Sequence, residues 1–262
     1  MFGFGKPRFP VDADEVDWLV ACFAWLSREF SKAGPLTTRP TILPDEHFYP
    51  PSRTTGHARA LELFEQTKAH AGMLDWPCEL RAGDPDRERS IALGHALKHH
   101  QSAPLGTFGY ADGRYVITYN PTSLAHPQTL IATFAHELAH FLLHTAKSPP
   151  PGGKALAEHA TDVGAAYLGF GIFMANSAKN FSQFQSAGEI GWEMRGAGYL
   201  SENALTTALA MMVRLTGANA TPVNGELKPY LRGVFRKALV AADRAYPDLA
   251  ATLEAVDLNE WA

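Results

Sequence analysis

Two histidines near the middle of the chain, His136 and His140, are four positions apart, and Glu137 directly follows the first of them. The surrounding segment 128–144 contains no glycine or proline, and its apolar pattern predicts a helix. Residues at i and i+4 of a helix share one face, so both imidazoles can converge on one ion while Glu137 polarises a bound water. The remaining positions are mostly apolar, so these polar groups would be buried without an evident reason unless they bind a metal.

A catalytic zinc site takes three protein ligands and leaves its fourth position to water, so one further ligand is required. After the Pro- and Gly-rich loop 147–154, the next predicted helix, at roughly 155–173, begins with Glu158 and Asp162 one turn apart. Glu158 can complete the site while Asp162 accepts a hydrogen bond from the free ring nitrogen of a ligand histidine. We therefore expect one Zn²⁺, bound by the two histidines and Glu158.

Each of these assignments has an alternative in the same sequence. Glu158 is near a helix N-terminus, where the helix dipole favours an acid without any metal, and Asp162 can be an ordinary surface acid. His144 continues the spacing of four, but it lies about 12 Å from His136 along the helix axis, too far for one ion to reach both. His159 is a weaker alternative ligand, because it points about 100° away from Glu158 around the helix.

The motif HExxH, followed on the next helix by ExxxD, resembles the gluzincin metallopeptidases, the thermolysin-like class. The segment ITYNP…TFAHELAHFLLH is also similar to the compact bacterial zinc peptidases of the ImmA/IrrE type, and the resemblance covers roughly residues 110–176. It implies a zinc-dependent metallopeptidase that hydrolyses a protein or peptide substrate with a metal-activated water. The resemblance implies that the metal ligands are His136, His140 and Glu158. It further implies that Asp162 forms a hydrogen bond with a ligand histidine and that Glu137 is the catalytic proton acceptor.

The resemblance also implies how a substrate binds. In gluzincins an extended peptide pairs with the edge strand before the active-site helix, and Tyr115–Tyr119 would be this strand. The chain carries no matching motif for the His or Tyr with which larger gluzincins stabilise the oxyanion. The polar residues that are candidates for this role are Tyr167, Tyr199, His126 and Asn176. Residues 1–100 and 180–262 resemble only uncharacterised bacterial proteins, so the identity of the substrate stays open.

Hydrophobic periodicity predicts an α+β fold that is mostly α-helical, with a zincin-like catalytic core and a small sheet before the active-site helix. Asp112-Gly113 between two aromatic, β-branched runs predicts a hairpin with Tyr115–Tyr119 as its second strand, and WPCEL is a further strand candidate. Further helices are expected at about 13–32, 55–73, 90–100, 201–216, 228–246 and 247–257. We expect one compact unit with an N-terminal helical and extended segment at 1–104, the catalytic core at 105–180 and a C-terminal helical segment at 181–262.

The composition is that of a globular protein without the charge of a nucleic-acid binder. Of the 262 residues, 46% are hydrophobic and 19% are charged, and the formal net charge is −4, so no nucleic-acid partner is expected. Cys22 and Cys78 are too few and too far apart in sequence for a disulfide scaffold or a thiolate metal cluster. The apolar run Trp18–Leu26 is shorter than the about 20 residues that span a bilayer, and the first residues lack a secretory pattern. We therefore expect a cytoplasmic protein with no membrane partner, and the oligomeric state stays open.

Two other functions are compatible with the same residues. A regulatory or interaction protein can hold the metal without turnover, and a zinc hydrolase can act on a bond other than a peptide bond. Glu137 argues against the first, because a purely structural zinc site does not need a carboxylate beside its open position.

The Pro-rich segment Pro40–Pro51 also has two interpretations. Phe48 and Tyr49 either pin the N-terminal helix to the core, or they belong to a segment that partly covers the zinc cleft and limits access to flexible peptides.

Overall fold

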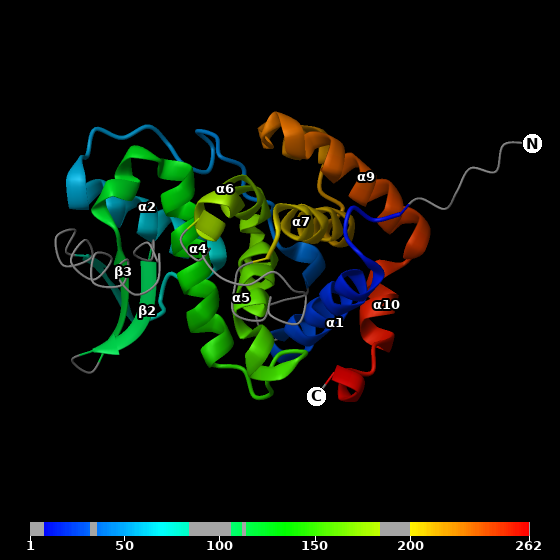
Figure 1. Ribbon diagram of the computed structural model, residues 1–262. Helices are drawn as coiled ribbons and strands as arrows, with labels where there is room; N and C mark the ends of the chain where they lie inside the picture. The colour runs from blue at the N-terminus through cyan, green and yellow to red at the C-terminus, as the bar shows by residue number, and fades with distance from the viewer. Residues whose placement is uncertain (1–7, 32–35, 84–105, 112–113, 184–199, 262) are drawn as a thin grey trace, which may run out of the picture.

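The structure is a computed structural model, and it describes residues 8–31, 36–83, 106–111, 114–183 and 200–261. In these ranges helices dominate, and one small sheet lies at one side of the helical body (Figure 1). The helices are α1 (Ala13–Glu29), α2 (Gly56–Ala71), α4 (Pro127–His144), α5 (Ala157–Ala165), α6 (Gly171–Gln183), α7 (Glu202–Thr216), α8 (Ala220–Glu226), α9 (Pro229–Ala245) and α10 (Leu249–Ala255). The strands are β1 (Cys78–Ala82), β2 (Gly106–Ala111) and β3 (Arg114–Tyr119). The prediction of a mostly helical α+β chain is confirmed.

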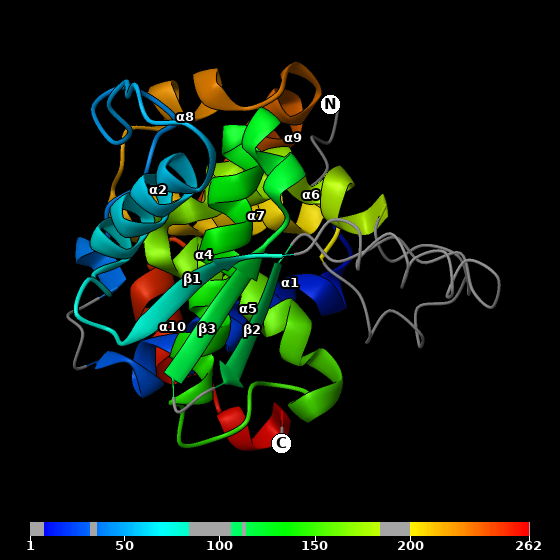
Figure 2. The same cartoon turned by 90° about the vertical axis from the view of Figure 1, so that its left-hand side faces the viewer.

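The three strands form a mixed sheet in the order β1-β3-β2. β3 runs parallel to β1 and antiparallel to β2, and Tyr115 lies opposite Cys78 on one side and opposite Tyr110 on the other. Alternate side chains of a strand point to the same face, and one face of this sheet packs on α4. The ring centroids of Tyr115 and Phe141 of α4 are 4.3 Å apart. Figure 2 shows α4 directly behind the sheet.

The position of β3 shows that one expectation, that Tyr115–Tyr119 is the edge strand for a substrate, is wrong. β3 lies in the centre of the sheet, so its backbone groups are paired with β1 on one side and with β2 on the other. A strand that is paired on both sides has no backbone groups left for an extended peptide. Among the described strands, β2 is the edge strand that packs against α4.

α4 lies at the centre of the fold, because apolar side chains cover most of its circumference. Phe134 and Leu138 are fully buried, and Phe64 of α2 packs edge-on against Phe134 with ring centroids 5.2 Å apart. α5 approaches another side of α4 at Gly164, where an added Cβ would lie 3.3 Å from the Cβ of Ala139. This close packing brings the two helices with the predicted metal ligands into direct contact.

The predicted helix 155–173 is interrupted in the structure. Between α5 and α6 the chain forms a π-helical turn at Ala166–Phe170, in which Gly169 has a φ of 105°. Glycine adopts this angle without the steric cost of a side chain. The carbonyl of Gly169 accepts a hydrogen bond from the N–H of Ile42 at 3.0 Å. The predicted loosening at Gly169 is confirmed, and the Pro-rich segment packs against it.

The segment Pro40–Pro51 packs on the helical core. The ring of Tyr49 lies edge-on against that of Phe173 of α6 at 5.6 Å, and Nε2 of His70 donates to the carbonyl of Phe48 at 2.7 Å. These contacts join the segment to α2 and α6. They support the interpretation in which the two aromatic residues pin the chain to the core.

Residues 200–261 form the helices α7 to α10, of which α8 was not predicted. α8 contains Pro222 and Gly225, residues that argue against a helix in a sequence. It begins because the side chain of Asn219 accepts a hydrogen bond from the N–H of Thr221 at 3.0 Å.

Two predicted features, the helix at 90–100 and the turn Asp112-Gly113, lie outside the described residues. The strands on either side of that turn pair antiparallel, as a hairpin requires. One hydrophobic cluster contains buried apolar residues from the sheet and from all the described helices, α1, α2 and α4 to α10. Within the described ranges, no helix is both long enough and apolar enough to pass through a bilayer.

Candidate metal centre

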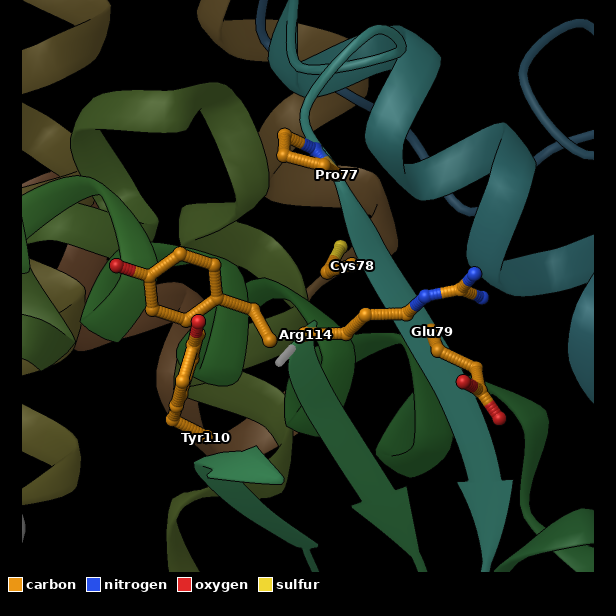
Figure 3. A pocket seen from close by; sticks show the side chains of 6 residues that line it. Pro77, Cys78, Glu79, Tyr110 and Arg114 are labelled. Atoms are coloured by element: carbon orange, nitrogen blue, oxygen red, sulfur yellow. The ribbon is translucent and has the colours of Figure 1, made fainter. Parts of the chain in front are cut away.

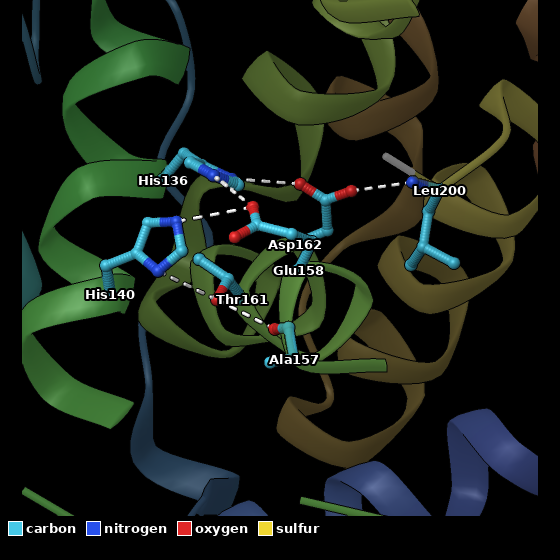
Figure 4. A network of polar contacts seen from close by, with 7 residues as sticks. All are labelled: His136, His140, Ala157, Glu158, Thr161, Asp162 and Leu200. Atoms are coloured by element: carbon cyan, nitrogen blue, oxygen red, sulfur yellow. Dashed lines mark hydrogen bonds and ion pairs between the residues drawn. The ribbon is translucent and has the colours of Figure 1, made fainter. Parts of the chain in front are cut away.

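Successive turns of α4 present His136 and His140 on one face, toward α5 (Figure 4). Their ring centroids are 4.7 Å apart and the ring planes are nearly perpendicular. His136 is only 1% exposed, whereas the side chain of His140 is 27% exposed. One imidazole is therefore fixed in the interior, and the other lies at the border to solvent.

Glu158, in the first turn of α5, faces both imidazoles. Its Oε2 lies 3.5 Å from Nε2 of His136 and 3.4 Å from Nε2 of His140. Two donors that bind zinc at about 2.1 Å in a tetrahedron are themselves about 3.4 Å apart. The donor atoms of the three side chains all lie within 4.8 Å of one another, and in the described part of the chain this is the one such group of three. The two pairs that Glu158 forms have this spacing, so the two imidazole nitrogens and the carboxylate oxygen can hold a zinc ion.

Asp162 is fully buried one turn after Glu158 and orients His136. Its Oδ1 lies 3.0 Å from Nδ1 of His136, and its Oδ2 accepts a hydrogen bond from the N–H of Leu200 at 2.7 Å (Figure 4). Because an ionised carboxylate only accepts, Nδ1 carries the proton, and Nε2 is the nitrogen that faces Glu158. The predicted bond between Asp162 and a candidate ligand is present, whereas the bond with Leu200 had no signal in the sequence.

Thr161 plays the corresponding role for His140, and sequence reasoning missed it. Its hydroxyl donates to the carbonyl of Ala157 at 3.0 Å, as threonine hydroxyls often do within a helix, and lies 3.3 Å from Nδ1 of His140. Since its single proton is used on the carbonyl, the hydroxyl accepts from Nδ1, which leaves Nε2 of His140 for a ligand bond. Thr161 lies three positions after Glu158, on the face already assigned to the site, and this spacing was the signal that could have found it.

The surroundings of His136 favour the protonated form of its imidazole. Burial by itself lowers the pKa of His136, but hydrogen bonds with Asp162 and Glu158 outweigh it and raise the pKa of this imidazole to about 10. Hydrogen bonds with His136 and His140 hold the pKa of Glu158 far below its usual range, against its partial burial. The carboxylates of Glu158 and Asp162 therefore favour a positive charge at the imidazole of His136 between them. Either a proton or a metal cation can supply this charge.

Glu137 lies beside the candidate ligands and is 5% exposed. Burial raises the pKa of its carboxyl, while the imidazoles of His136 and His140 and a hydrogen bond from the backbone N–H of Phe108 act in the opposite direction. Phe108 belongs to β2, so the edge strand reaches the candidate centre. A backbone donor leaves no side-chain signal, and for this reason the sequence did not indicate Phe108.

The other two histidines that were weighed as ligands lie outside the group. His144 is exposed, and its ring centroid is 5.9 Å from that of Tyr115 in the sheet. His159 is buried, and its ring lies 6.0 Å from that of Trp18 of α1.

The structure places three of the four candidates for oxyanion stabilisation, and none of them belongs to the group of three candidate ligands. Tyr167 is fully buried within the π-helical turn. Asn176 donates to the carbonyl of Glu226 at 3.0 Å and so joins α6 to the end of α8. His126 precedes the first residue of α4, and Tyr199 lies outside the described residues.

A pocket of about 430 Å³ opens at the end of the sheet where β1 and β3 begin (Figure 3). Its lining residues are Pro77, Cys78, Glu79, Tyr110, Arg114 and Tyr115. Figure 3 shows Arg114 reaching from β3 toward the side of β1 that carries Glu79. Burial raises the pKa of the Cys78 thiol, so it stays protonated near neutral pH. The pocket includes none of the candidate metal ligands.

Comparison of the chain with known proteins found no match among protein-family models, curated proteins or solved structures. The chemistry of the site is therefore inferred from its own residues.

Proposed function

We propose that this protein is a zinc-dependent metallopeptidase with a zincin-like core, in which His136, His140 and Glu158 bind zinc. The observation that carries the proposal is the position of Glu158 Oε2, 3.5 Å and 3.4 Å from the two Nε2 atoms, because neighbouring ligands of tetrahedral zinc have this spacing. The second ring nitrogen of each imidazole is also engaged, with Asp162 for His136 and with Thr161 for His140. Such bonds fix the tautomer that a ligand histidine needs.

Zinc at this position would lower the pKa of a water in its fourth coordination site to about 7 and polarise a substrate carbonyl. Glu137 would accept a proton from the attacking water at its buried carboxylate as the water oxygen adds to the carbonyl carbon, and would pass it to the amine nitrogen as the C–N bond breaks. The N–H of Phe108 bonds to this carboxylate and stabilises its ionised form. Because burial raises the pKa of Glu137, the carboxylate is a better proton acceptor than an exposed one near neutral pH.

An extended peptide is the substrate form that the surroundings favour. β2 is an edge of the described sheet, and through Phe108 it runs past Glu137. A peptide that pairs with this edge as an added strand would bring a backbone carbonyl close to the three candidate ligands. β2 thus takes the role that the sequence had given to Tyr115–Tyr119.

The test is cleavage of a denatured peptide library by the purified full chain with one equivalent of zinc, read by mass spectrometry. We expect cleavage that a chelator abolishes and added zinc restores, and that the variant Glu137→Gln lacks. His144→Ala is the matched control, because His144 lies on the same helix outside the group of three.

Zinc binding without cleavage of any peptide would instead support a protein that holds the metal for a regulatory purpose. Cleavage that persists in Glu137→Gln or in the chelated protein would contradict the proposed mechanism.

A further inference from the structure

The connection between the two ligand-bearing helices, residues 145–156, ends in a short 3-10 helix at Gly153–Leu156, and the N–H of Gly152 donates to the carbonyl of Trp261 at 2.9 Å. Its middle is the run Pro149–Gly153, in which the three prolines offer no N–H and the two glycines have positive φ values of 79° and 64°. α5 then begins without a side-chain cap, because Leu156 occupies its N-cap position. Glu158 lies in this uncapped first turn. Contacts from outside the connection therefore contribute to the position of the third candidate ligand, together with the packing of α5 on α4.

The end of α1 holds the start of this connection. The carboxylate of Glu29 accepts one hydrogen bond from the N–H of Lys147 at 2.7 Å and another from the hydroxyl of Ser148 at 2.6 Å. The indole Nε1 of Trp25 donates to the same hydroxyl at 3.0 Å. Two side chains of α1 thus fix the first residues after α4.

Trp18, two turns earlier on α1, holds the middle of the connection. Its indole Nε1 donates to the carbonyl of Pro151 at 3.0 Å in a buried bond. The edge of its ring system also packs against His159, with ring centroids 6.0 Å apart and an interplanar angle of 76°. His159 directly follows Glu158, so one indole contacts both the connection and the turn that carries the third candidate ligand.

We propose that Trp18 is a positioning residue for Glu158 and that α1 thereby sets the metal affinity of the centre. The inference rests on the proposed function in so far as Glu158 is a metal ligand. His136 and His140 lie on one helix, so the helical backbone fixes their relative position. Glu158 lies on another helix, so its position relative to the histidines depends on how the two helices pack. Metal sites require their ligands within about 0.5 Å of the productive position, and an uncapped helix end meets this only when its neighbours restrain it.

The test compares Trp18→Phe with Trp76→Phe in the full chain. The first variant keeps an aromatic ring and removes the donor to Pro151. Trp76 is a matched control, because it packs edge-on against Phe141 on another side of α4, with ring centroids 4.8 Å apart. Zinc affinity is measured by competition with a chromogenic chelator, and ligand geometry is measured by the absorption spectrum of the cobalt-substituted protein.

We expect Trp18→Phe to weaken zinc affinity by about 10- to 100-fold, as loss of an outer partner of a ligand does, and to alter the cobalt spectrum. Trp76→Phe is expected to keep the wild-type zinc affinity and cobalt spectrum, even if its melting temperature falls by as much as that of Trp18→Phe. Equal zinc affinities in the two variants and the wild type would overturn the proposal.

Hydrogen exchange in the zinc-free protein gives a readout that does not need the metal. The amides of residues 160–163 close the first turn of α5, and Trp18→Phe is expected to speed their exchange while Trp76→Phe leaves it unchanged. Faster exchange in a protein that binds no zinc would contradict the metal site and support the positioning of the turn. Unchanged exchange would overturn the positioning role.

If Trp18→Phe fails to fold, Glu29→Gln replaces it as the test. This change acts at the start of the connection and removes the charged acceptor of two hydrogen bonds. A several-fold weaker zinc affinity at an unchanged melting temperature would support the role of α1, and wild-type affinity would overturn it.

Discussion

His136 and Asp162 join the two helices of the candidate centre through a buried hydrogen bond, 3.0 Å long between Nδ1 and Oδ1. The second oxygen of Asp162 accepts from the N–H of Leu200 at 2.7 Å, just before α7. One carboxylate thus links α4, α5 and the start of α7, and both of its oxygens are satisfied despite full burial. The centre is therefore built by three segments of the chain and not by the two helices alone.

One zinc ion per chain is expected after purification without chelators, because the described residues contain a single group of three candidate ligands. His140→Ala is expected to bring the zinc content close to zero, while His144→Ala keeps it at one. Elemental analysis of the three proteins checks this. A wild type without zinc, or an unchanged content in His140→Ala, would contradict the ligand assignment.

Glu137→Gln is expected to preserve the fold and zinc content and to lower kcat by about 10²- to 10⁴-fold, the usual contribution of general acid–base catalysis. The amide keeps the shape of the side chain but cannot accept a proton. Steady-state kinetics on the best peptide from the library measures the effect. Activity within about tenfold of the wild type would exclude the role given to Glu137.

Asp162→Asn is expected to weaken zinc affinity by about 10- to 100-fold, and Glu158→Ala is expected to weaken it further. In the proposed centre Asp162 only orients His136, whereas Glu158 supplies a ligand atom. Titration with zinc in the presence of a competing chelator gives the order of the two variants. The reverse order would exchange their roles.

Zinc affinity is expected to rise with pH until the imidazole of His136 loses its proton, with a midpoint at about pH 10. The zinc-free imidazole has a raised pKa, so the ion has to displace a proton near neutral pH, and binding releases about one proton. Calorimetry in buffers with different ionisation enthalpies measures this release. Binding that releases no proton at neutral pH would contradict the protonated state of the zinc-free centre.

The stability of the zinc-free protein is expected to change with pH in the opposite direction. The folded pKa of His136 is raised from 6.5 to about 10, so its stabilising contribution is full below pH 6.5 and is lost as the pH rises through about 10. The melting temperature of the zinc-free protein therefore falls over this window. The same scan on Asp162→Asn, which lacks one of the two carboxylates that bond to this imidazole, is expected to show a smaller fall.

Gly169→Ala is expected to destabilise the fold by about 2–4 kcal/mol, because the new side chain causes both backbone strain and a steric clash. An added Cβ would lie 2.4 Å from the carbonyl oxygen of Pro40, and Gly169 has a φ of 105°. A backbone oxygen cannot move away without displacing the chain around it. Gly217→Ala is the matched control, since its φ is also positive but its Cβ would meet open space. It is expected to cost only about 1–2 kcal/mol. Urea denaturation of both variants checks the difference.

The sequence was most informative where one helical segment was sufficient. The spacing of His136, Glu137 and His140 fixes their shared face, because 3.6 residues per turn is a local property of the backbone. The spacing of Glu158 and Asp162 indicates a second face in the same way. Gly169 likewise indicated a loosened helix. α8 was missed because Asn219 caps a segment whose proline and glycine argue against a helix.

Other features depend on neighbours that no local pattern identifies. β3 reads as a half-buried strand whether it lies at the edge or in the centre, and only the pairing of β1 with its other side decides between the two. The N–H of Phe108 reaches Glu137 because β2 packs on α4, and Leu200 reaches Asp162 because α7 starts beside α5.

The sequence by itself therefore determined the types of the candidate ligands and the helical faces on which they lie, since these follow from composition and helical period. Only the tertiary structure decided that Glu158 meets both histidines, that Thr161 and Asp162 orient them, and that β2 is the edge strand beside Glu137. These contacts join segments that are distant in sequence, and their geometry is set by the packing of whole helices and strands.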